Sequence, residues 1–145
     1  MTRVEVSTVI DAPPRVVYDY VDDHDYYPQY WHGFKNFEAT SKRHEVGTRL
    51  KMEGMALGIR LPMELETTEV VPEHRIAFRF ISGMKGQGEW TFMPAGVGTK
   101  VTCITDYELP MGVLGQIADR AVVERDIRAN LEKTLASLQQ KAEAR

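Results

Sequence analysis

Glu124 and Arg128 stand one helical turn apart in a segment of helical apolar periodicity, residues 113–142. A single helix through this segment places these apolar side chains on one stripe: Ile117, Ala121, Leu131 and Leu135. The charged pair falls in the middle of that stripe, where a dry ion costs several kcal/mol. Glu124 and Arg128 therefore either border a cavity and set its polar end, or reach solvent where the helix overhangs the sheet.

A second group of candidate residues consists of the aromatic side chains Tyr27, Tyr30 and Trp31. Tyrosine and tryptophan combine apolar faces with polar tips, which suits the lip of a small-molecule pocket. The alternative is that these rings pack short helices onto the sheet. Met52 and Met63 belong to a larger set of methionines in the strand region, and methionine fills either an irregular ligand site or an ordinary core.

Strand alternation provides the remaining candidates, because residues two apart in a strand share one face of the sheet. The concave face is predicted to carry Met63, Phe78, Phe80, Trp90, Phe92 and Tyr107. A slip of one residue in the register would move all of these side chains to the solvent side.

No sequence motif assigns catalysis or cofactor binding to a particular residue. The histidines are His24, His32, His44 and His74. They are scattered, and none has a partner at the spacing of metal ligands. The glycines at 83, 86 and 88 stand between two strands and open no helix, unlike a dinucleotide-binding fingerprint. We therefore expect no metal, nucleotide or flavin cofactor, and the catalytic residues stay unassigned.

Turn residues divide the chain into short elements. An alternating strand at 3–10 is followed by a short helix at 14–21 and by a turn or second short helix at 23–31. Further strands are predicted at 34–41, 47–54, 59–70, 74–82, 87–94 and 99–109. The short gaps between them favour antiparallel neighbours, and Pro62, which cannot donate to a ladder, indicates an edge or a bulge.

Composition excludes several classes of protein. The 145 residues carry 18 basic and 21 acidic side chains, a net charge of −3, which lacks the basic footprint of a nucleic-acid-binding protein. No run approaches the ~18 apolar residues of a membrane-spanning helix, so no stable membrane insertion is expected. The single cysteine, Cys103, cannot form an internal disulfide and favours a reducing cytoplasm. Length indicates one domain, 1–145, and leaves the oligomeric state open.

A long helix beside a long sheet has a physical consequence. A helix over 113–142 would extend ~45 Å, so it must cross the whole domain and lie against the sheet. We expect an α+β fold in which a seven-stranded curved antiparallel sheet wraps around this helix, with two short helices between the first two strands. One helix cannot fill the concave side of a strongly twisted sheet, and the remaining space would form a small-molecule cavity.

Several segments, in this order, resemble the START/SRPBCC superfamily, whose helix-grip fold is shared with pollen-allergen-like proteins. They are Ile10-Asp11-Ala12-Pro13-Pro14, Tyr27-Pro28 with Tyr30-Trp31, Trp90-Thr91-Phe92, Gly98-Thr99-Lys100-Val101-Thr102 and Leu109-Pro110. Within the superfamily the chain looks most like the bacterial polyketide cyclase/dehydrase and lipid transport branch. The resemblance implies binding of lipids, quinones, polyketides or similar molecules, and no catalytic motif of the cyclases maps onto this sequence.

Three functions remain open at this level. The first is a carrier or sensor that binds a hydrophobic or amphipathic small molecule, such as a lipid, an isoprenoid or quinone, or a polyketide. The alternative is a polyketide aromatase/cyclase that uses the same cavity, with Tyr107 or the Glu124–Arg128 pair as acid–base groups. The third is a protein-interaction module whose patch would be Tyr26, Tyr30 and Trp31.

Overall fold

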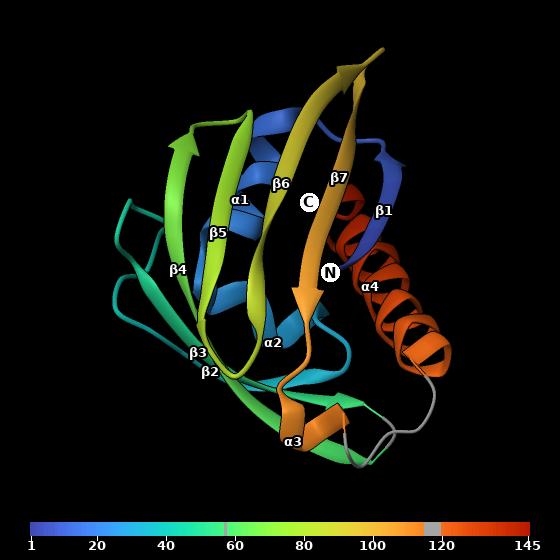
Figure 1. Ribbon diagram of the computed structural model, residues 1–145. Helices are drawn as coiled ribbons and strands as arrows, with labels where there is room; N and C mark the ends of the chain where they lie inside the picture. The colour runs from blue at the N-terminus through green and yellow to red at the C-terminus, as the bar shows by residue number, and fades with distance from the viewer. Residues whose placement is uncertain (57, 115–119) are drawn as a thin grey trace.

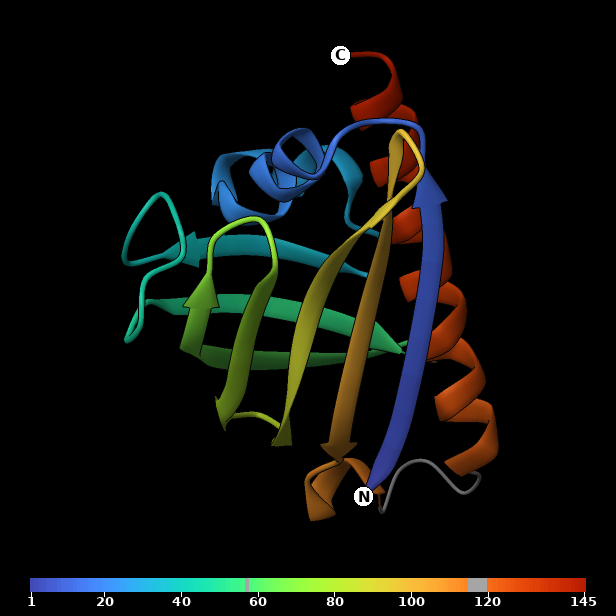
Figure 2. The same ribbon diagram turned by 90° about the horizontal axis from the view of Figure 1, so that it is seen from above.

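The computed structural model, which describes residues 1–56, 58–114 and 120–145, contains a seven-stranded antiparallel sheet. The strands are β1 (Thr2–Ile10), β2 (Phe34–Ala39), β3 (Arg49–Ala56), β4 (Ile59–Val71), β5 (Arg75–Ser82), β6 (Lys85–Ala95) and β7 (Gly98–Glu108). Their order across the sheet is β1-β7-β6-β5-β4-β3-β2, so only the first strand pairs out of sequence. The sheet curls: in Figure 2 the strands β2, β3 and β4 turn away from the direction of β1 and β7.

Short helices and one long helix complete the fold. They are α1 (Pro14–Asp22), the 3-10 turn η1 (His24–Tyr26), α2 (Tyr27–Tyr30), α3 (Met111–Leu114) and α4 (Arg120–Glu143). Helix α4 runs alongside the edge strand β1, and α1 and α2 lie at one end of the sheet (Figures 1 and 2). Seven antiparallel strands, two short helices between β1 and β2, and a long C-terminal helix match the predicted helix-grip architecture. No helix of the described residues is long and apolar enough to span a membrane.

The predicted register of the central strands is confirmed. All six side chains expected on the concave face belong to the core or pack against it: Met63, Phe78, Phe80, Trp90, Phe92 and Tyr107. Strand pairing aligns Trp90 with Ile76 on one side and Cys103 on the other, which are also core residues. The alternation of apolar and polar residues therefore decided which face of the sheet is buried.

Pro62 lies where its missing N–H is tolerated. Strand β4 pairs with β3 through Pro62 and Glu53, but its pairing with β5 begins only at Glu64. The β5 side of Pro62 therefore has no strand partner, as the sequence predicted. Register shifts follow between Glu64 and Leu65 and between Thr67 and Glu69, and such bulges bend a strand and help to curl the sheet.

The C-terminal helix differs from the single helix expected over 113–142. Within 113–142 and just before it, the described residues form two helices, α3 and α4. Residues 115–119, including Ile117, lie outside the described part of the chain. The buried side chains of α4 are Val123, Leu131, Thr134, Leu135, Leu138 and Ala142, with Ile127 packed beside them. Ala121 is exposed, so the predicted stripe was wrong at this end. The buried face drifts around α4 as the helix crosses a twisted sheet, which a straight stripe does not describe.

Candidate functional site

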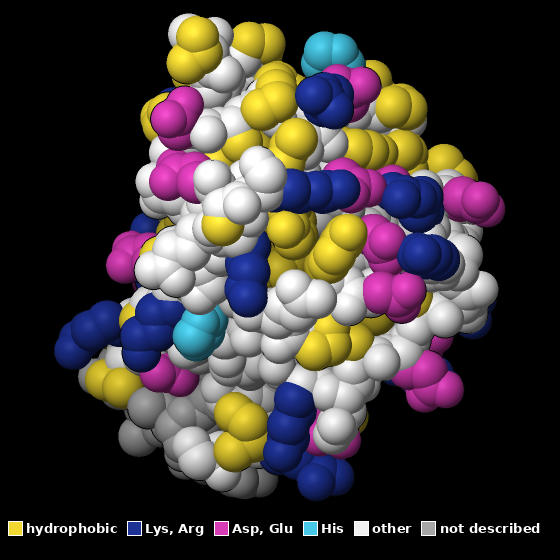
Figure 3. All heavy atoms as spheres, turned by 180° about the vertical axis from the view of Figure 1, so that it is seen from behind, with side chains coloured by type: hydrophobic (Ala, Val, Ile, Leu, Met, Phe, Trp, Pro, Cys, Tyr) yellow, Lys and Arg dark blue, Asp and Glu magenta, His cyan; other side chains and the backbone are white. Residues whose placement is uncertain are grey.

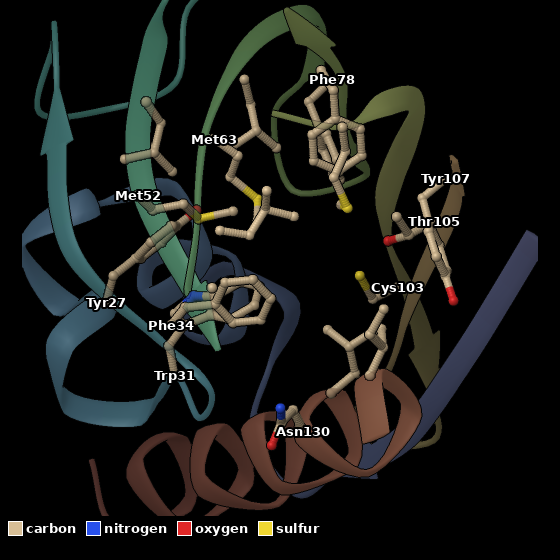
Figure 4. A pocket seen from close by; sticks show the side chains of 18 of the residues that line it. Tyr27, Trp31, Phe34, Met52, Met63, Phe78, Cys103, Thr105, Tyr107 and Asn130 are labelled. Atoms are coloured by element: carbon tan, nitrogen blue, oxygen red, sulfur yellow. The ribbon is translucent and has the colours of Figure 1, made fainter. Parts of the chain in front are cut away.

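An apolar cavity of about 110 Å³ lies between the concave face of the sheet, α2 and α4. Strands β3, β4 and β5 supply methionine, leucine and phenylalanine side chains, and α4 supplies Ile127, Asn130 and Leu131. Figure 4 shows these side chains converging from the sheet above and the helix below. The cavity arises because one helix spans a curved sheet without filling its concave side.

Most of the residues proposed from sequence line this cavity. They are Tyr27, Trp31, Met52, Met63, Phe78, Phe80, Trp90 and Tyr107. Trp31 meets Trp90 edge-on with ring centroids 5.9 Å apart, which joins the short helices to the centre of the sheet. A role of these side chains in ligand binding stays a prediction.

Two of the predicted aromatic residues lie elsewhere in the core. Tyr30 is fully buried, and its hydroxyl donates to the carbonyl of Tyr20 at 2.9 Å. Phe92 packs edge-on against Tyr18, with 5.3 Å between ring centroids, beneath helix α1. These rings attach the short helices to the sheet, which is the alternative that the sequence left open for the aromatic cluster. Because Tyr30 is buried and Trp31 faces the cavity, the exposed interaction patch proposed for them is wrong.

Glu124 and Arg128 do not line the cavity. Their side chains are about two-fifths exposed and form an ion pair of 3.6 Å, while Nη1 of Arg128 donates to the carbonyl of Glu5 on β1 at 3.1 Å. The second alternative from the sequence therefore holds, and the cavity-facing placement was wrong. The reason is the drift of the buried face, since at this end of α4 Val123 and Ile127 turn inward instead.

Asn130 is the polar residue of α4 that sequence reasoning missed. Its side chain points from the helix into the cavity (Figure 4). Gly33 permits this position, because a methyl group there would collide with Nδ2 of Asn130. A signal was present in the sequence: Asn130 is an amide directly beside Leu131 and three residues after Ile127, on the apolar side of the helix.

Burial raises the pKa of several groups that line the cavity. Burial raises the pKa of the Cys103 thiol to about 12 and raises the pKa of the Tyr27 phenol well above its ordinary value. Burial, and then the charge of Glu124, raises the pKa of Tyr107. At neutral pH these groups are therefore uncharged, and the thiol is a poor nucleophile.

One end of the cavity is supported by a cluster of polar groups. His44 lines the wall, and both its backbone N–H and its Nδ1 bond to Asp22, at 3.0 and 2.9 Å. Arg43 donates to the carboxylate of Asp22 at 3.2 Å. Burial by itself raises the pKa of Asp22, but the bonds from His44 and Arg43 outweigh it and hold the pKa below its ordinary value. The loop between β2 and β3 is thereby attached to the end of α1.

The ring of His24 stacks on that of His44 and predicts a pH-dependent stability. Burial, and then the neighbouring His44, lowers the pKa of His24 below 6.5, while its Nδ1–H donates to backbone carbonyls of the β2–β3 loop. As pH falls from 6.5 toward the lowered pKa of His24, this residue binds a proton in the unfolded chain but not in the folded chain. The free energy of unfolding therefore falls. Thermal unfolding at pH 7.5 and 5.0 should therefore show a smaller loss of Tm for His24→Asn than for the wild type.

The exposed His74 provides the control for this measurement. His74→Asn should retain the full wild-type loss of Tm between the two pH values. An equal loss in all three proteins would show that His24 titrates in the folded state as it does in the unfolded chain.

A metal centre is not evident within residues 1–56, 58–114 and 120–145, where no group of three or more His, Cys, Asp or Glu side chains has suitable geometry.

On the described part of the face in Figure 3, basic and acidic side chains are interspersed. That face therefore presents mixed charge around hydrophobic side chains.

The curved sheet, the long helix and the cavity between them define a protein of the helix-grip class. Residues 1–143 match the family described as polyketide cyclase/dehydrase and lipid transport, and the chain belongs to this family. The resemblance inferred from the sequence is thus confirmed. A search of curated proteins gave no match.

Solved structures support the same fold. A protein from Thermus thermophilus, TTHA0849, is 27% identical, with 99% of this chain and 98% of that chain covered and a TM-score of 0.85. A START superfamily protein from Mycobacterium smegmatis is 17% identical over 98% and 97% of the chains, with a TM-score of 0.78. The di-domain ARO/CYC BexL from the BE-7585A biosynthetic pathway is 19% identical, with a TM-score of 0.73, and the match covers 99% of this chain and 49% of that chain.

Proposed function

We propose that the protein binds an apolar or amphipathic small molecule, such as a lipid, an isoprenoid or quinone, or a polyketide, in the cavity between sheet and helix. The observation that carries this proposal is the wall itself, in which large apolar side chains surround open space instead of closing it. Burial of apolar ligand surface would supply affinity at about 25 cal/mol per Å². Asn130 is proposed to orient a polar group of the ligand from the helix side.

The size of the cavity limits what it accepts without rearrangement. A dry cavity of about 150 Å³ holds a molecule as small as benzene, and the cavity here is about 110 Å³. Larger ligands must displace side chains, and the wall contains Met52, Met63 and Met84. Methionine has three rotatable bonds and repacks at low cost, so these residues are proposed to move on binding.

Binding is favoured over the cyclase alternative by the position of the acid–base candidates. Of those proposed from sequence, Tyr107 lines the cavity, whereas Glu124 and Arg128 form their ion pair outside it. A tyrosine is protonated at neutral pH and the raised pKa of Tyr107 makes its phenolate still harder to form, so it could donate a proton but not abstract one. A cytoplasmic location, inferred from the single thiol, also stays a proposal.

A cavity-filling variant tests the proposed function. Thr105 on β7 points into the cavity (Figure 4), and its neighbour Ile104 points to the other face of the sheet. Thr105→Phe should weaken binding of an apolar fluorescent dye at least ~10-fold, the equivalent of about 1.4 kcal/mol. Ile104→Phe should bind the dye as the wild type does.

Native mass spectrometry provides a second measurement with the same variants. Ligand carried through purification should appear as an added mass on the wild type and on Ile104→Phe, and should be absent from Thr105→Phe. Wild-type dye affinity in a well-folded Thr105→Phe would contradict binding in this cavity.

A further inference from the structure

The wall of the cavity at Tyr27 and His44 presents two hydrogen-bond acceptors side by side. Oη of Tyr27 and Nε2 of His44 lie 3.4 Å apart, and both residues line the cavity. Tyr27 is 3% exposed and the side chain of His44 is 9% exposed, so neither relies on bulk water. What this end of the cavity can bind depends on where the hydrogens of these two groups point.

The surrounding carbonyls determine both hydrogens. Nδ1 of His44 lies 2.9 Å from the carbonyl oxygen of Asp22, which can only accept, so Nδ1 carries the hydrogen and Nε2 is a lone pair in the neutral ring. The hydroxyl of Tyr27 donates to the carbonyl of Val21 at 2.8 Å, which leaves its oxygen lone pairs toward His44. While the His44 ring is neutral, both groups therefore accept and do not donate.

The neighbouring Thr48 adds no free donor to this end of the wall. The hydroxyl of Ser41 donates to the carbonyl of Arg43 at 2.6 Å, so the hydroxyl of Thr48, at 2.8 Å from Ser41 Oγ, must donate to Ser41. The oxygen of Thr48 also receives the backbone N–H of Glu45 at 3.0 Å. Thr67 is another wall residue. Its hydroxyl rotates and can either donate or accept a hydrogen bond, so it does not discriminate between ligands.

The acceptor pair is held in place from behind. The ring of His24 stacks on His44 with 4.2 Å between centroids, and Asp22 receives the backbone N–H of His44 at 3.0 Å. Such support reduces the rotational freedom that binding would otherwise cost. The carboxylate of Asp22 behind the ring also makes this end unfavourable for a second anion.

We propose that this acceptor pair selects apolar ligands bearing a hydroxyl group, an alcohol or a phenol, which donates its hydrogen to Nε2 of His44 and Oη of Tyr27. The inference rests on the proposed function, because it names the chemical class that the cavity takes. A ketone, an ether or a carboxylate offers only lone pairs and would leave Nε2 of His44 without a donor. An unpaired buried acceptor carries a desolvation penalty of about 1–3 kcal/mol.

A matched pair of probes tests the proposal. 2-Naphthol and its methyl ether share one ring system and one oxygen, but only the naphthol can donate. Their dissociation constants are measured by displacement of the dye used above. In the wild type 2-naphthol should bind about 10-fold more tightly than the ether. In His44→Phe, which retains a ring but no acceptor, the ratio should fall to about 1 through loss of naphthol affinity, with ether affinity retained.

Controls separate this proposal from the proposed ligand binding on which it rests. Tyr27→Phe removes the other acceptor and should also reduce the ratio, which keeps the test decisive where His44→Phe folds poorly. His74→Phe, an exposed position, should retain the wild-type ratio. Equal binding of both probes by the wild type, or an unchanged ratio in both cavity variants, would overturn hydroxyl selection alone. Failure of the wild type to bind either probe or the dye would contradict ligand binding itself and this selection with it.

Discussion

Replacing Trp90 with alanine is expected to lower the free energy of unfolding by about 3–5 kcal/mol, the range for large aromatic residues in cores. Trp90 is 3% exposed at the middle of β6, between the core residues Ile76 and Cys103 of the neighbouring strands. Its ring also contacts Trp31, so it links the sheet to the short helices. The space left by the ring would merge with the existing cavity and enlarge it.

Urea denaturation measures this loss, and the adjacent residue supplies the control. Thr91 follows Trp90 on the same strand and faces the opposite side of the sheet. Thr91→Ala should change the free energy of unfolding by no more than about 0.5 kcal/mol. A loss below about 1 kcal/mol for Trp90→Ala would mean that the methionine-rich wall repacks around the missing ring.

Gly88→Ala is expected to cost about 1–3 kcal/mol of stability and to weaken ligand binding as well. Gly88 pairs with Phe78 across the β5–β6 ladder and with Thr105 across the β6–β7 ladder. A methyl group on Gly88 would lie 2.5 Å from Cζ of Phe78 and 2.6 Å from the carbonyl oxygen of Ile104. The backbone oxygen cannot retreat without breaking the ladder, so the ring of Phe78, which lines the cavity, must move.

Gly112 is the matched control for this substitution, because a methyl group there meets no atom within 4 Å. Gly112→Ala should leave both the urea midpoint and the dye affinity at their wild-type values. If Gly88→Ala lowers stability but leaves dye affinity unchanged, Phe78 does not contribute to the binding surface.

The inner face of the sheet was readable in the sequence because strand alternation has a fixed period of two. The apolar residues of a strand therefore mark which of its two faces is buried. Once Ile76, Phe78 and Phe80 share a face, the register of the neighbouring strands aligns Trp90 with them and Tyr107 follows. Pro62 was equally readable, since a residue without an N–H tolerates few places in a ladder. These local rules determined the architecture and most of the cavity wall.

The helix and the polar end of the cavity were decided only by tertiary structure. The phase of α4 depends on how the helix crosses a twisted sheet, so Asn130 faces the cavity and Glu124 and Arg128 lie over β1. His44 is one of four scattered histidines in the sequence, and its role arises from contacts with Asp22 and Tyr27, 22 and 17 residues away. Periodicity reports the angle of a side chain about its own element, whereas the partners of a polar group are set by packing between elements distant in the chain.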